Sequence, residues 1–492
     1  MIAGPSPSPS LPASASASAS ASASVSGFVS VRVPVCEGRW LVIGAGPAGL
    51  ACGKNLRDAG LDFDIVERYG GLGGIWRYGR VGGSVYRSTT LISSKRLAAF
   101  RGFAMPDHWP DYISHGQALR YLRDYARTYC LIDKIRFGVE VVTATPALTG
   151  LGWDVTFADG CCTRYRGIVV ATGHHWEPNW PAGLDTFTGT VVHSGEYRTP
   201  ALFQGRRVLV VGGGNSGCDI AVESARTAVR TFHSVRSWGW FLPKFFLGRP
   251  TDEVLEQLVR WHAPRWTRAL LRRLMVGCVF GDVSRFGLPR PVGGFLGGRL
   301  VLNSEIVHQV AHGHVRPKPA VSAFEGGRVR FADGTGERVD VVVCATGYRA
   351  VLPFLPDRYA RLGQAGGGPG FPLHAFTCDR DDLFVVGMVQ PDSGAWWLFD
   401  DQARLVVSYI RAAARAGAPA ARSIVDRAAR RRYSPGGLRV DHDRYATVLA
   451  GTARRLDRLA ARTAGAARTA GAAGTAATAL VPTSAMADEE RV

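Results

Sequence analysis

The chain contains little lysine. Only five of its 59 basic residues are lysines, so arginine spread along the whole length supplies nearly all of the net charge of +19. A nucleic-acid or anionic-membrane role predicts basic residues gathered on one element with aromatics between them. The densest arginine runs, residues 260–273 and 422–432, instead mix arginine with apolar residues at helical spacing, as in amphipathic helices with solvated faces. The sequence therefore predicts no nucleic-acid partner.

A long hydrophobic run is also missing. Neither end holds the roughly 18 strongly apolar residues that cross a bilayer, so no membrane span is predicted. Residues 1–36 are mostly Ser/Ala/Pro low complexity without a basic segment before an apolar one, which argues against a signal peptide. We expect a disordered leader there, or an overlong start assignment, and a disordered Ala/Arg-rich tail over residues 451–492.

None of the nine cysteines forms a C-x-x-C pair. This usage fits a reducing cytoplasm and argues against a disulfide-reductase type of flavoenzyme. The adjacent Cys161 and Cys162 leave vicinal thiol chemistry open, although strand or turn positions are the simpler interpretation. Two other signatures are incomplete, because Gln309 stands where H-E-x-x-H needs its glutamate and Ser216 lacks the spacer that a nucleophile elbow places before Gly217. The sequence predicts no metal site and no serine nucleophile.

Two glycine-rich fingers are the most informative feature that is present. The first, GAGPAG at residues 44–49, follows a strand expected at residues 40–43 and opens a helix expected over residues 49–58. Glycines there let backbone N–H groups reach a pyrophosphate at the positive end of a helix. A second strand, expected at residues 63–66, leads to Glu67, whose carboxylate can bond both ribose hydroxyls. This unit predicts FAD or NAD, and an α/β unit that binds nothing is the alternative.

The second finger, GGGNSG at residues 212–217, repeats the plan between strands expected at residues 208–211 and 229–233. Its second strand is followed by Ser234 and Arg236 instead of an acid. A hydroxyl and a guanidinium can bind a 2′-phosphate that a carboxylate would repel. NADPH is therefore favoured over NADH, with Arg236 as a solvated surface charge the alternative.

Two short apolar strands end in Ala-Thr-Gly, at residues 171–173 and 345–347, on either side of the second finger. A small residue followed by glycine allows a sharp turn and a close approach to a cofactor. The pattern predicts an α/β fold of two Rossmann-like dinucleotide-binding domains, with the NADPH domain inserted into the FAD domain. The predicted boundaries are 37–180 for the first part of the FAD domain, 181–330 for the NADPH domain and 331–450 for the second part of the FAD domain.

Several motifs together resemble the class B flavin monooxygenases, the group of the flavin-containing monooxygenases and their Baeyer–Villiger relatives. The most specific is F-x-G-x-x-x-H-S-x-x-Y-R at residues 187–198. Its Tyr-Arg ending resembles the flavin-containing branch, whereas Trp-Pro would resemble the Baeyer–Villiger branch. The sequences GGIW at residues 73–76 and SSK at residues 93–95 add to the resemblance, which covers residues 38–412.

The resemblance implies an NADPH- and FAD-dependent enzyme that inserts one oxygen atom of O2 into the amine nitrogen or sulfide sulfur of a small molecule through a C4a-hydroperoxyflavin. A Baeyer–Villiger monooxygenase acting on ketones is the nearest alternative. The flavin-containing branch usually carries asparagine where this chain has Ile92, so an NADPH oxidase or reductase without oxygen transfer also stays open. We expect Ile92 to line the flavin pocket with Ser93 as a substitute donor. A homodimer remains open.

Three further features have a functional and a structural interpretation. His193 is expected to position the link between the domains and not to act as a base. Trp76 covers FAD or packs in the core, and residues 238–298 cover the active site or pack on the NADPH domain. The residues expected to bind the two cofactors are Gly44, Gly46, Ala48, Gly49, Glu67, Gly74, Ile75, Trp76, Val141, Thr172, Gly212, Gly214, Asn215, Ser216, Gly217, Ser234, Arg236 and Gln402.

Overall fold

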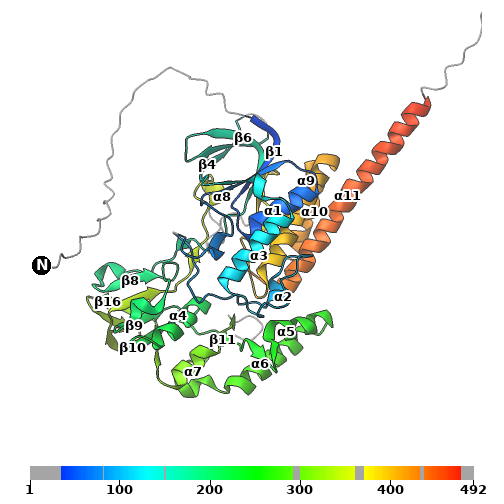
Figure 1. Cartoon of the computed structure of the whole chain (residues 1–492). Coiled ribbons are helices and arrows are strands. Elements are labelled where there is room, and N and C mark those ends of the chain that lie inside the picture. The colour runs from blue at the N-terminus through cyan, green and yellow to red at the C-terminus, as the bar shows by residue number, and fades with distance from the viewer. Residues whose placement is uncertain are drawn as a thin grey trace, which may run out of the picture.

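The computed structural model describes residues 35–80, 82–148, 151–291, 300–360, 371–432 and 437–477. Within them two β-sheets form the centres of two lobes (Figure 1). The predicted leader up to residue 34 and the predicted tail after residue 477 lie outside the described residues.

The first sheet has the order β3-β2-β1-β6-β5-β4, and a seventh strand, β21, pairs with β6. Alternate residues of its central strand point to opposite faces, so Val42 packs in one core cluster and Leu41 with Ile43 in another. Burial on both faces explains the unbroken apolar run that marks this strand in the sequence. The strands are β1 (Val35–Ile43), β2 (Phe63–Glu67), β3 (Ile135–Phe137), β4 (Val141–Pro146), β5 (Trp153–Phe157), β6 (Cys162–Val170) and β21 (Leu383–Val385).

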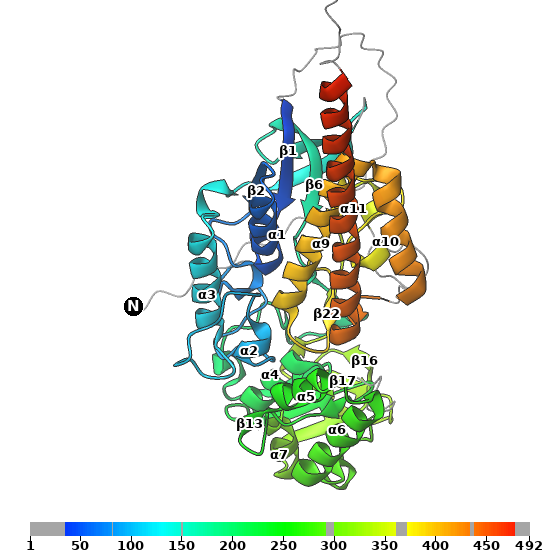
Figure 2. The same cartoon turned by 90° about the vertical axis from the view of Figure 1, so that its right-hand side faces the viewer.

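Helices cover one face of this sheet, and side chains from them share its main hydrophobic core. The capping box of Ser114 and Gln117 starts one of them, α3 (His115–Thr128), at the position where its amphipathic pattern begins. The others are α1 (Pro47–Asp58), α9 (Ala395–Ala416), α10 (Ala418–Arg432) and α11 (His442–Ala477). Figure 2 shows α9, α10 and α11 side by side.

The tail prediction is wrong over residues 451–477, because α11 continues through them. Leu449, Leu456 and Ala460 are buried in the core shared with α9, at spacings that keep them on one face of the helix. The Ala/Arg-rich composition therefore forms an amphipathic helix as far as its side chains are described. No helix among the described residues is long and apolar enough to cross a membrane.

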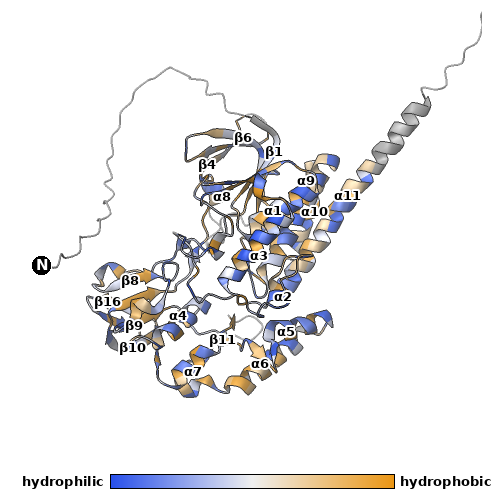
Figure 3. Ribbon diagram, viewed as in Figure 1, coloured by the Kyte–Doolittle hydropathy of each residue, from blue (hydrophilic) through white to orange (hydrophobic). Residues whose placement is uncertain are grey.

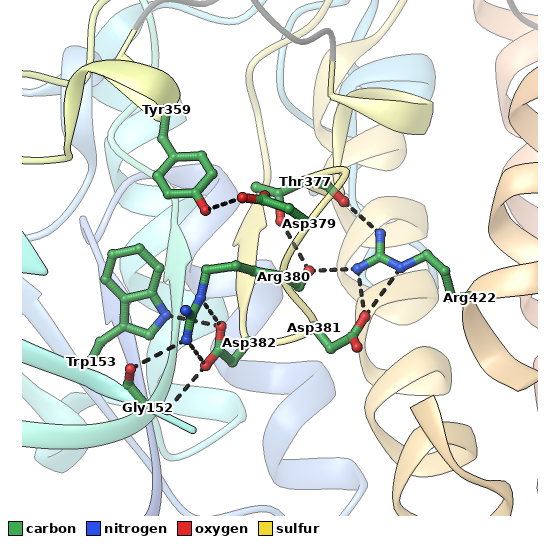
Figure 4. A network of polar contacts seen from close by, with 9 residues as sticks. All are labelled: Gly152, Trp153, Tyr359, Thr377, Asp379, Arg380, Asp381, Asp382 and Arg422. Atoms are coloured by element: carbon green, nitrogen blue, oxygen red, sulfur yellow. Dashed lines mark hydrogen bonds and ion pairs between the residues drawn. The ribbon is translucent and has the colours of Figure 1, made fainter. Parts of the chain in front are cut away.

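A turn just before β21 ties the C-terminal helices to the first sheet (Figure 4). Arg422 of α10 forms an ion pair with Asp381, while Arg380 forks onto the carboxylate of Asp382 at 2.6 and 2.7 Å. That carboxylate also accepts a hydrogen bond from the indole of Trp153 at 3.1 Å. The network fixes the turn between two layers of the lobe and lies apart from both fingers.

The second sheet is parallel throughout and has the order β15-β10-β9-β19-β8. Beside it lie the helices α4 (Asn215–Ala225) and α7 (Glu305–Ala311) and a three-stranded antiparallel sheet of β16 (Val321–Glu325), β17 (Arg328–Phe331) and β18 (Gly336–Arg338). The strands of the second sheet are β8 (Thr190–His193), β9 (Arg207–Val211), β10 (Arg230–Ser234), β15 (Val315–Lys318) and β19 (Val341–Cys344).

The chain crosses between the lobes at two adjacent segments, β7 (Glu177–Pro178) and β20 (Tyr348–Arg349), which pair antiparallel. The sheet strands described between them belong to the second lobe, so the predicted insertion is present. The predicted return at residue 331 is too early, since β19 pairs with both β8 and β9 of the second sheet. The return follows the second Ala-Thr-Gly sequence at residues 345–347.

Residues 238–291 leave the second sheet and reach back toward the first lobe. The excursion contains β11 (Trp240–Phe241), β12 (Phe245–Phe246), β13 (Arg249–Pro250), α5 (Thr251–Arg260) and α6 (Arg265–Phe280), and β14 (Leu300–Val301) pairs with β11. In Figure 3, α5 is mostly hydrophilic and α6 carries more hydrophobic residues. Val276 and Phe280 join the core of the second lobe, whereas Arg268 pairs with Asp443 of α11 at 2.8 Å. The packing interpretation of this segment is therefore confirmed, and the segment also contacts the FAD domain at α11, whereas its covering of the active site stays a prediction.

Candidate active site

The first finger forms a turn that only glycine can make. Gly44 has φ 108°, and a Cβ on it would lie 2.7 Å from the carbonyl oxygen of Ala171. A Cβ on Gly49 would lie 1.8 Å from the carbonyl oxygen of Gly44, because α1 crosses directly behind the loop. The helix begins with Gly46 as its N-cap, without a capping side chain and without an acidic residue in its first turn. Its first N–H groups therefore fit an anion such as a pyrophosphate.

The end of β2 brings Glu67 onto this turn. Its buried carboxylate accepts hydrogen bonds from the N–H of Ala45 at 2.9 Å and of Tyr69 at 3.2 Å. At the end of β6 the hydroxyl of Thr172 is buried without a hydrogen-bond partner in the protein. Val141 starts β4 shortly after Val139, whose N–H donates to the carbonyl of Glu67 at 3.0 Å. Three predicted FAD residues, Glu67, Thr172 and Val141, thus stand at the ends of separate strands, and the orphaned hydroxyl fits a bound polar group.

The segment with Gly74, Ile75 and Trp76 forms a short 3-10 helix, η1 (Gly74–Trp76), against the back of the finger. A Cβ on Gly46 would lie 3.6 Å from the Cα of Gly74, so the two loops approach closely. The ring of Trp76 meets that of Trp396, at the start of α9, edge-on at 5.8 Å. The core interpretation of Trp76 is therefore confirmed, and its contact with FAD stays a prediction.

Gln402 is fully buried in α9. Its Oε1 accepts from the N–H of Gly387 at 3.0 Å, and its Nε2 donates to the hydroxyl of Tyr445 at 2.7 Å. A Cβ on Gly387 would lie 2.5 Å from the Cβ of Ala48 at the start of α1. Gln402 thus holds the loop after β21 against the first finger, and its contact with FAD stays a prediction.

The second finger repeats the geometry of the first. A Cβ on Gly212, which has φ 121°, would lie 2.2 Å from the carbonyl oxygen of Ala345, and one on Gly217 would lie 1.9 Å from the carbonyl oxygen of Gly212. A Cβ on Gly214 would meet no atom within 4 Å. Open space therefore lies in front of the N-terminus of α4, which also lacks a capping side chain. This is the room that a pyrophosphate needs.

Two residues of the second finger, Asn215 and Ser216, have different surroundings. Asn215 uses its Oδ1 to accept the N–H of Leu302 at 3.1 Å, which attaches the finger to the loop after β14. Ser216 is exposed in the first turn of α4. Ser216 is therefore open to a ligand, whereas Asn215 also has a structural task.

The end of β10 does not present both groups predicted for a 2′-phosphate. Ser234 is 1% exposed, and its hydroxyl donates to the carbonyl oxygen of Pro319 at 2.6 Å. This bond holds the edge of the sheet and turns the hydroxyl away from solvent, so the expectation of a ligand-facing Ser234 is not supported. Arg236 is exposed two residues further on and remains the candidate.

His193, at the end of β8, bonds to the chain just before it returns to the first lobe. Its Nδ1 accepts the N–H of Gly195 at 3.2 Å, so its Nε2 carries the proton and donates to the carbonyl oxygen of Gly347 at 3.0 Å. Burial lowers the pKa of His193, which keeps the ring neutral and preserves this tautomer. The predicted positioning role is thus the one that its contacts describe.

Two neighbouring histidines after the first Ala-Thr-Gly sequence were missed by the sequence analysis. The rings of His174 and His175 lie 4.1 Å apart, and the ring of Tyr348 on the returning segment lies 5.5 Å from that of His175. Burial lowers the pKa of His174 to about 4 and that of His175 to about 3. Both rings are neutral at physiological pH and form an aromatic bridge at the crossing. Adjacent histidines have no signature in sequence that would have marked them.

The predicted flavin-pocket residues lie on the loop before α2 (Lys95–Ala98). Ile92 is 46% exposed and Ser93 is half-buried. An isoleucine that open to water has no core to pack into, which agrees with a position on a cavity wall but does not test it. Among the described residues no group of three or more His, Cys, Asp or Glu side chains could hold a metal ion.

Two fingers with matching geometry on one chain define a protein with two dinucleotide-binding sites. The chain belongs to the flavin-binding monooxygenase-like family, which matches residues 37–444. It is 33% identical over 374 residues to flavin-containing monooxygenase 5 of Rattus norvegicus, covering 72% of this chain and 69% of that protein. It is 32% identical over 389 residues to dimethylaniline monooxygenase (N-oxide-forming) 2 of Mus musculus, covering 74% and 71%.

The fold is also that of solved monooxygenases. The structure of cyclohexanone monooxygenase from Rhodococcus sp. Phi1 bound to NADP+ aligns with a TM-score of 0.64 at 19% identity, covering 87% of this chain and 98% of that one. The family relationship makes this protein a flavin-dependent monooxygenase that uses FAD and NADPH, as the fingers predicted.

Proposed function

We propose that the protein transfers one oxygen atom of O2 to the amine nitrogen or sulfide sulfur of a small molecule and reduces the other atom to water with the electrons of NADPH. The observation that carries the proposal is the Tyr197-Arg198 ending of the motif at residues 187–198, which resembles the flavin-containing branch. The relative named for N-oxide formation, at 32% identity, supports it. The absence of a C-x-x-C pair among the nine cysteines supports a reducing, cytoplasmic setting for this reaction.

Both motif residues have defined partners at the lobe junction. The hydroxyl of Tyr197 donates to the carboxylate of Glu223 on α4, and Arg198 donates to the carbonyl oxygens of Gly195 at 2.6 Å and Arg80 at 3.2 Å. These contacts fasten the loop around residue 80, which follows η1, to the NADPH domain. The motif therefore supports a fixed orientation of one cofactor site against the other.

FAD, when bound, supplies the hydride acceptor and the oxygen activation. The chain contributes binding and exclusion of water: the N-termini of α1 and α4 hold the two pyrophosphates, Gln402 holds the loop at Gly387, and the excursion contacts both lobes. No side-chain nucleophile is required, in agreement with the incomplete elbow at Ser216.

A direct test compares three substrates with the purified, FAD-loaded protein. We expect NADPH-dependent formation of an N-oxide from N,N-dimethylaniline or a sulfoxide from methyl phenyl sulfide, measured by mass spectrometry. Lactone from cyclohexanone as the main product would instead favour a Baeyer–Villiger enzyme. NADPH consumption matched by hydrogen peroxide with every substrate would favour an oxidase.

The oxidase alternative depends on one position. If Ile92 lines the flavin pocket, Ile92→Asn restores an amide there and lowers the hydrogen peroxide released per NADPH. An unchanged ratio would remove Ile92 from the pocket. Ile132→Asn, at another exposed isoleucine near β3, is the matched control.

A further inference from the structure

A loop of the FAD domain is anchored by the NADPH domain at every fourth residue. We call residues 86–94 the strap; it follows η1 in the chain and ends at α2. Its anchors are Tyr86, Thr90 and Ser94, and it carries Ile92 and Ser93 between the last two. The strap is fixed to its own domain as well, since the N–H of Leu91 donates to the carbonyl of Ile113 at 2.9 Å.

Each anchor has a partner from the inserted domain or its excursion. The hydroxyl of Tyr86 donates to Asp219 Oδ2 at 2.8 Å. The hydroxyl of Thr90 accepts from Lys244 Nζ at 3.2 Å. A third contact is the N–H of Ser94, which donates to Asp252 Oδ2 at 2.6 Å. The strap is thus held by hydrogen bonds from both domains.

The first anchor places its side chain in the core of the other domain. The ring of Tyr86 is 4% exposed and lies in the hydrophobic core of the NADPH domain, 5.5 Å from the ring of Tyr197. Its partner Asp219 also accepts from Asn303 Nδ2 at 2.6 Å, so the carboxylate is held from two sides. Burial raises the pKa of Asp219, and its hydrogen bonds oppose that rise.

Asp219 belongs to the helix that receives the cofactor. It stands four residues after Asn215, which starts α4, just behind the second finger. A shift of α4 on binding NADPH therefore moves Asp219, and through it the hydroxyl of Tyr86 at one end of the strap. Ile92 lies six residues along this strap.

We propose that the Tyr86–Asp219 hydrogen bond is a positioning contact that sets the strap according to the state of the NADPH-binding helix and thereby keeps water out of the flavin pocket. It rests on the NADPH-dependent reaction of the family and on the predicted place of Ile92, not on the choice of substrate. In the productive reaction NADPH, H+, O2 and substrate give NADP+, water and oxygenated substrate. Without oxygen transfer, NADPH, H+ and O2 give NADP+ and H2O2, and loosening the strap favours this outcome.

The test measures hydrogen peroxide release by the FAD-loaded protein supplied with NADPH and air alone. Tyr86→Phe keeps the ring in the core and removes only the hydroxyl, which is bonded to Asp219 and also to the side chain of Ser216. We expect it to raise the rate of peroxide release about 10-fold, as for one lost hydrogen bond to a charged group. The rate of flavin reduction by NADPH, followed by loss of absorbance without air, should change less than about 2-fold. Such a change corresponds to a few tenths of a kcal/mol in the activation free energy.

A second pair of variants separates positioning from simple loss of structure. Asp219→Asn keeps an acceptor for the Tyr86 hydroxyl and should release peroxide more slowly than Asp219→Leu, which keeps none. Tyr86→Phe combined with Asp219→Leu should be no leakier than the worse single variant, because both remove one interaction. Tyr359→Phe removes a hydroxyl bonded to Asp379 at 2.7 Å in the network of Figure 4 and serves as the matched control.

Two results would overturn the proposal. One is peroxide release by Tyr86→Phe at the rate of the Tyr359→Phe control. The other is slower flavin reduction with unchanged peroxide release, which would assign the pair to NADPH binding alone. If Asp219→Leu does not fold, judged by FAD content, the isosteric Tyr86→Phe decides the matter by itself.

Discussion

The Nε2–H of His193 donates to the carbonyl oxygen of Gly347 at the point where the chain returns from the inserted domain. One residue stands at the end of β8 and the other directly before β20. The bond therefore stabilises the junction between the two domains. Its strength affects both the stability of the fold and the alignment of the two cofactors.

Removing this imidazole should weaken the junction. His193→Leu leaves the buried N–H of Gly195 without its partner, at a cost of about 1–3 kcal/mol, while the carbonyl of Gly347 keeps only the N–H of Asn179. We expect a lower free energy of unfolding in urea and slower flavin reduction by NADPH. His314→Leu, at an exposed histidine bonded to Gln309, is the control. Wild-type values for both measurements in His193→Leu would contradict the positioning role.

The two glycines of the second finger should respond differently to alanine. Gly217→Ala places a Cβ 1.9 Å from a backbone oxygen, so we expect a destabilised NADPH domain and poor yield of folded protein. Gly214→Ala meets no protein atom and has a permitted φ of −82°, so it should fold with normal FAD content. Its methyl group enters the space predicted for the pyrophosphate and should raise KM for NADPH at least about 10-fold, equal to one lost hydrogen bond to a charged group. An unchanged KM would place the pyrophosphate elsewhere.

Arg236 should carry the preference for NADPH. Arg236→Glu replaces the guanidinium by a carboxylate that repels the 2′-phosphate, and we expect KM for NADPH to rise by about 10-fold or more, with KM for NADH little changed. The two KM values, taken from initial rates of flavin reduction, measure this directly. Arg230→Glu, at the exposed start of the same strand, is the matched control. Equal effects in the two variants would show a general charge effect instead.

Buried neutral histidines should make the fold sensitive to acid. The pKa is lowered by burial to about 4 in His174, about 3 in His175 and about 4 in His374, from 6.5 in the unfolded chain. Below pH 6.5 the unfolded state binds protons that the folded state does not, so stability is complete above that pH and falls as the pH drops toward 4. Each histidine contributes up to about 1.4 kcal/mol per pH unit.

Urea midpoints at several pH values between 8 and 5 test this. We expect them to fall below pH 6.5 and to fall less steeply in His174→Phe, which cannot titrate. A midpoint independent of pH, or an equal slope in the variant, would show that these rings accept protons in the folded state.

Local signals predicted the parts of this molecule that local geometry determines. Each finger needs glycine where a Cβ would strike backbone, as at Gly49 and Gly217, so its spacing is visible in the sequence. The Tyr86–Asp219 contact joins residues 133 positions apart, and no pattern near either residue announces it. Ser234 was misjudged because the sequence does not reveal that Pro319 offers its carbonyl.

The boundary errors have a similar origin. The predicted return to the FAD domain at residue 331 falls at the end of β17 (Arg328–Phe331) in the small antiparallel sheet. Nothing in the local sequence shows that the later strand β19 pairs with β8 and β9 of the inserted domain. The tail prediction relied on composition, and alanine and arginine are abundant both in disordered segments and in helices. The buried positions Leu449 and Leu456 are the periodic signal that composition conceals.

The antiparallel pairing of β7 with β20 brings the two ends of the inserted lobe together, Glu177 opposite Arg349 and Pro178 opposite Tyr348. An inserted segment whose first and last residues are neighbours can be replaced as one unit. It can be exchanged for that of a relative with a different nicotinamide preference at the cost of only two peptide junctions. Such chimaeras would transfer the second finger and Arg236 together, but they would also separate Asp219 from Tyr86 unless the strap is transferred with them.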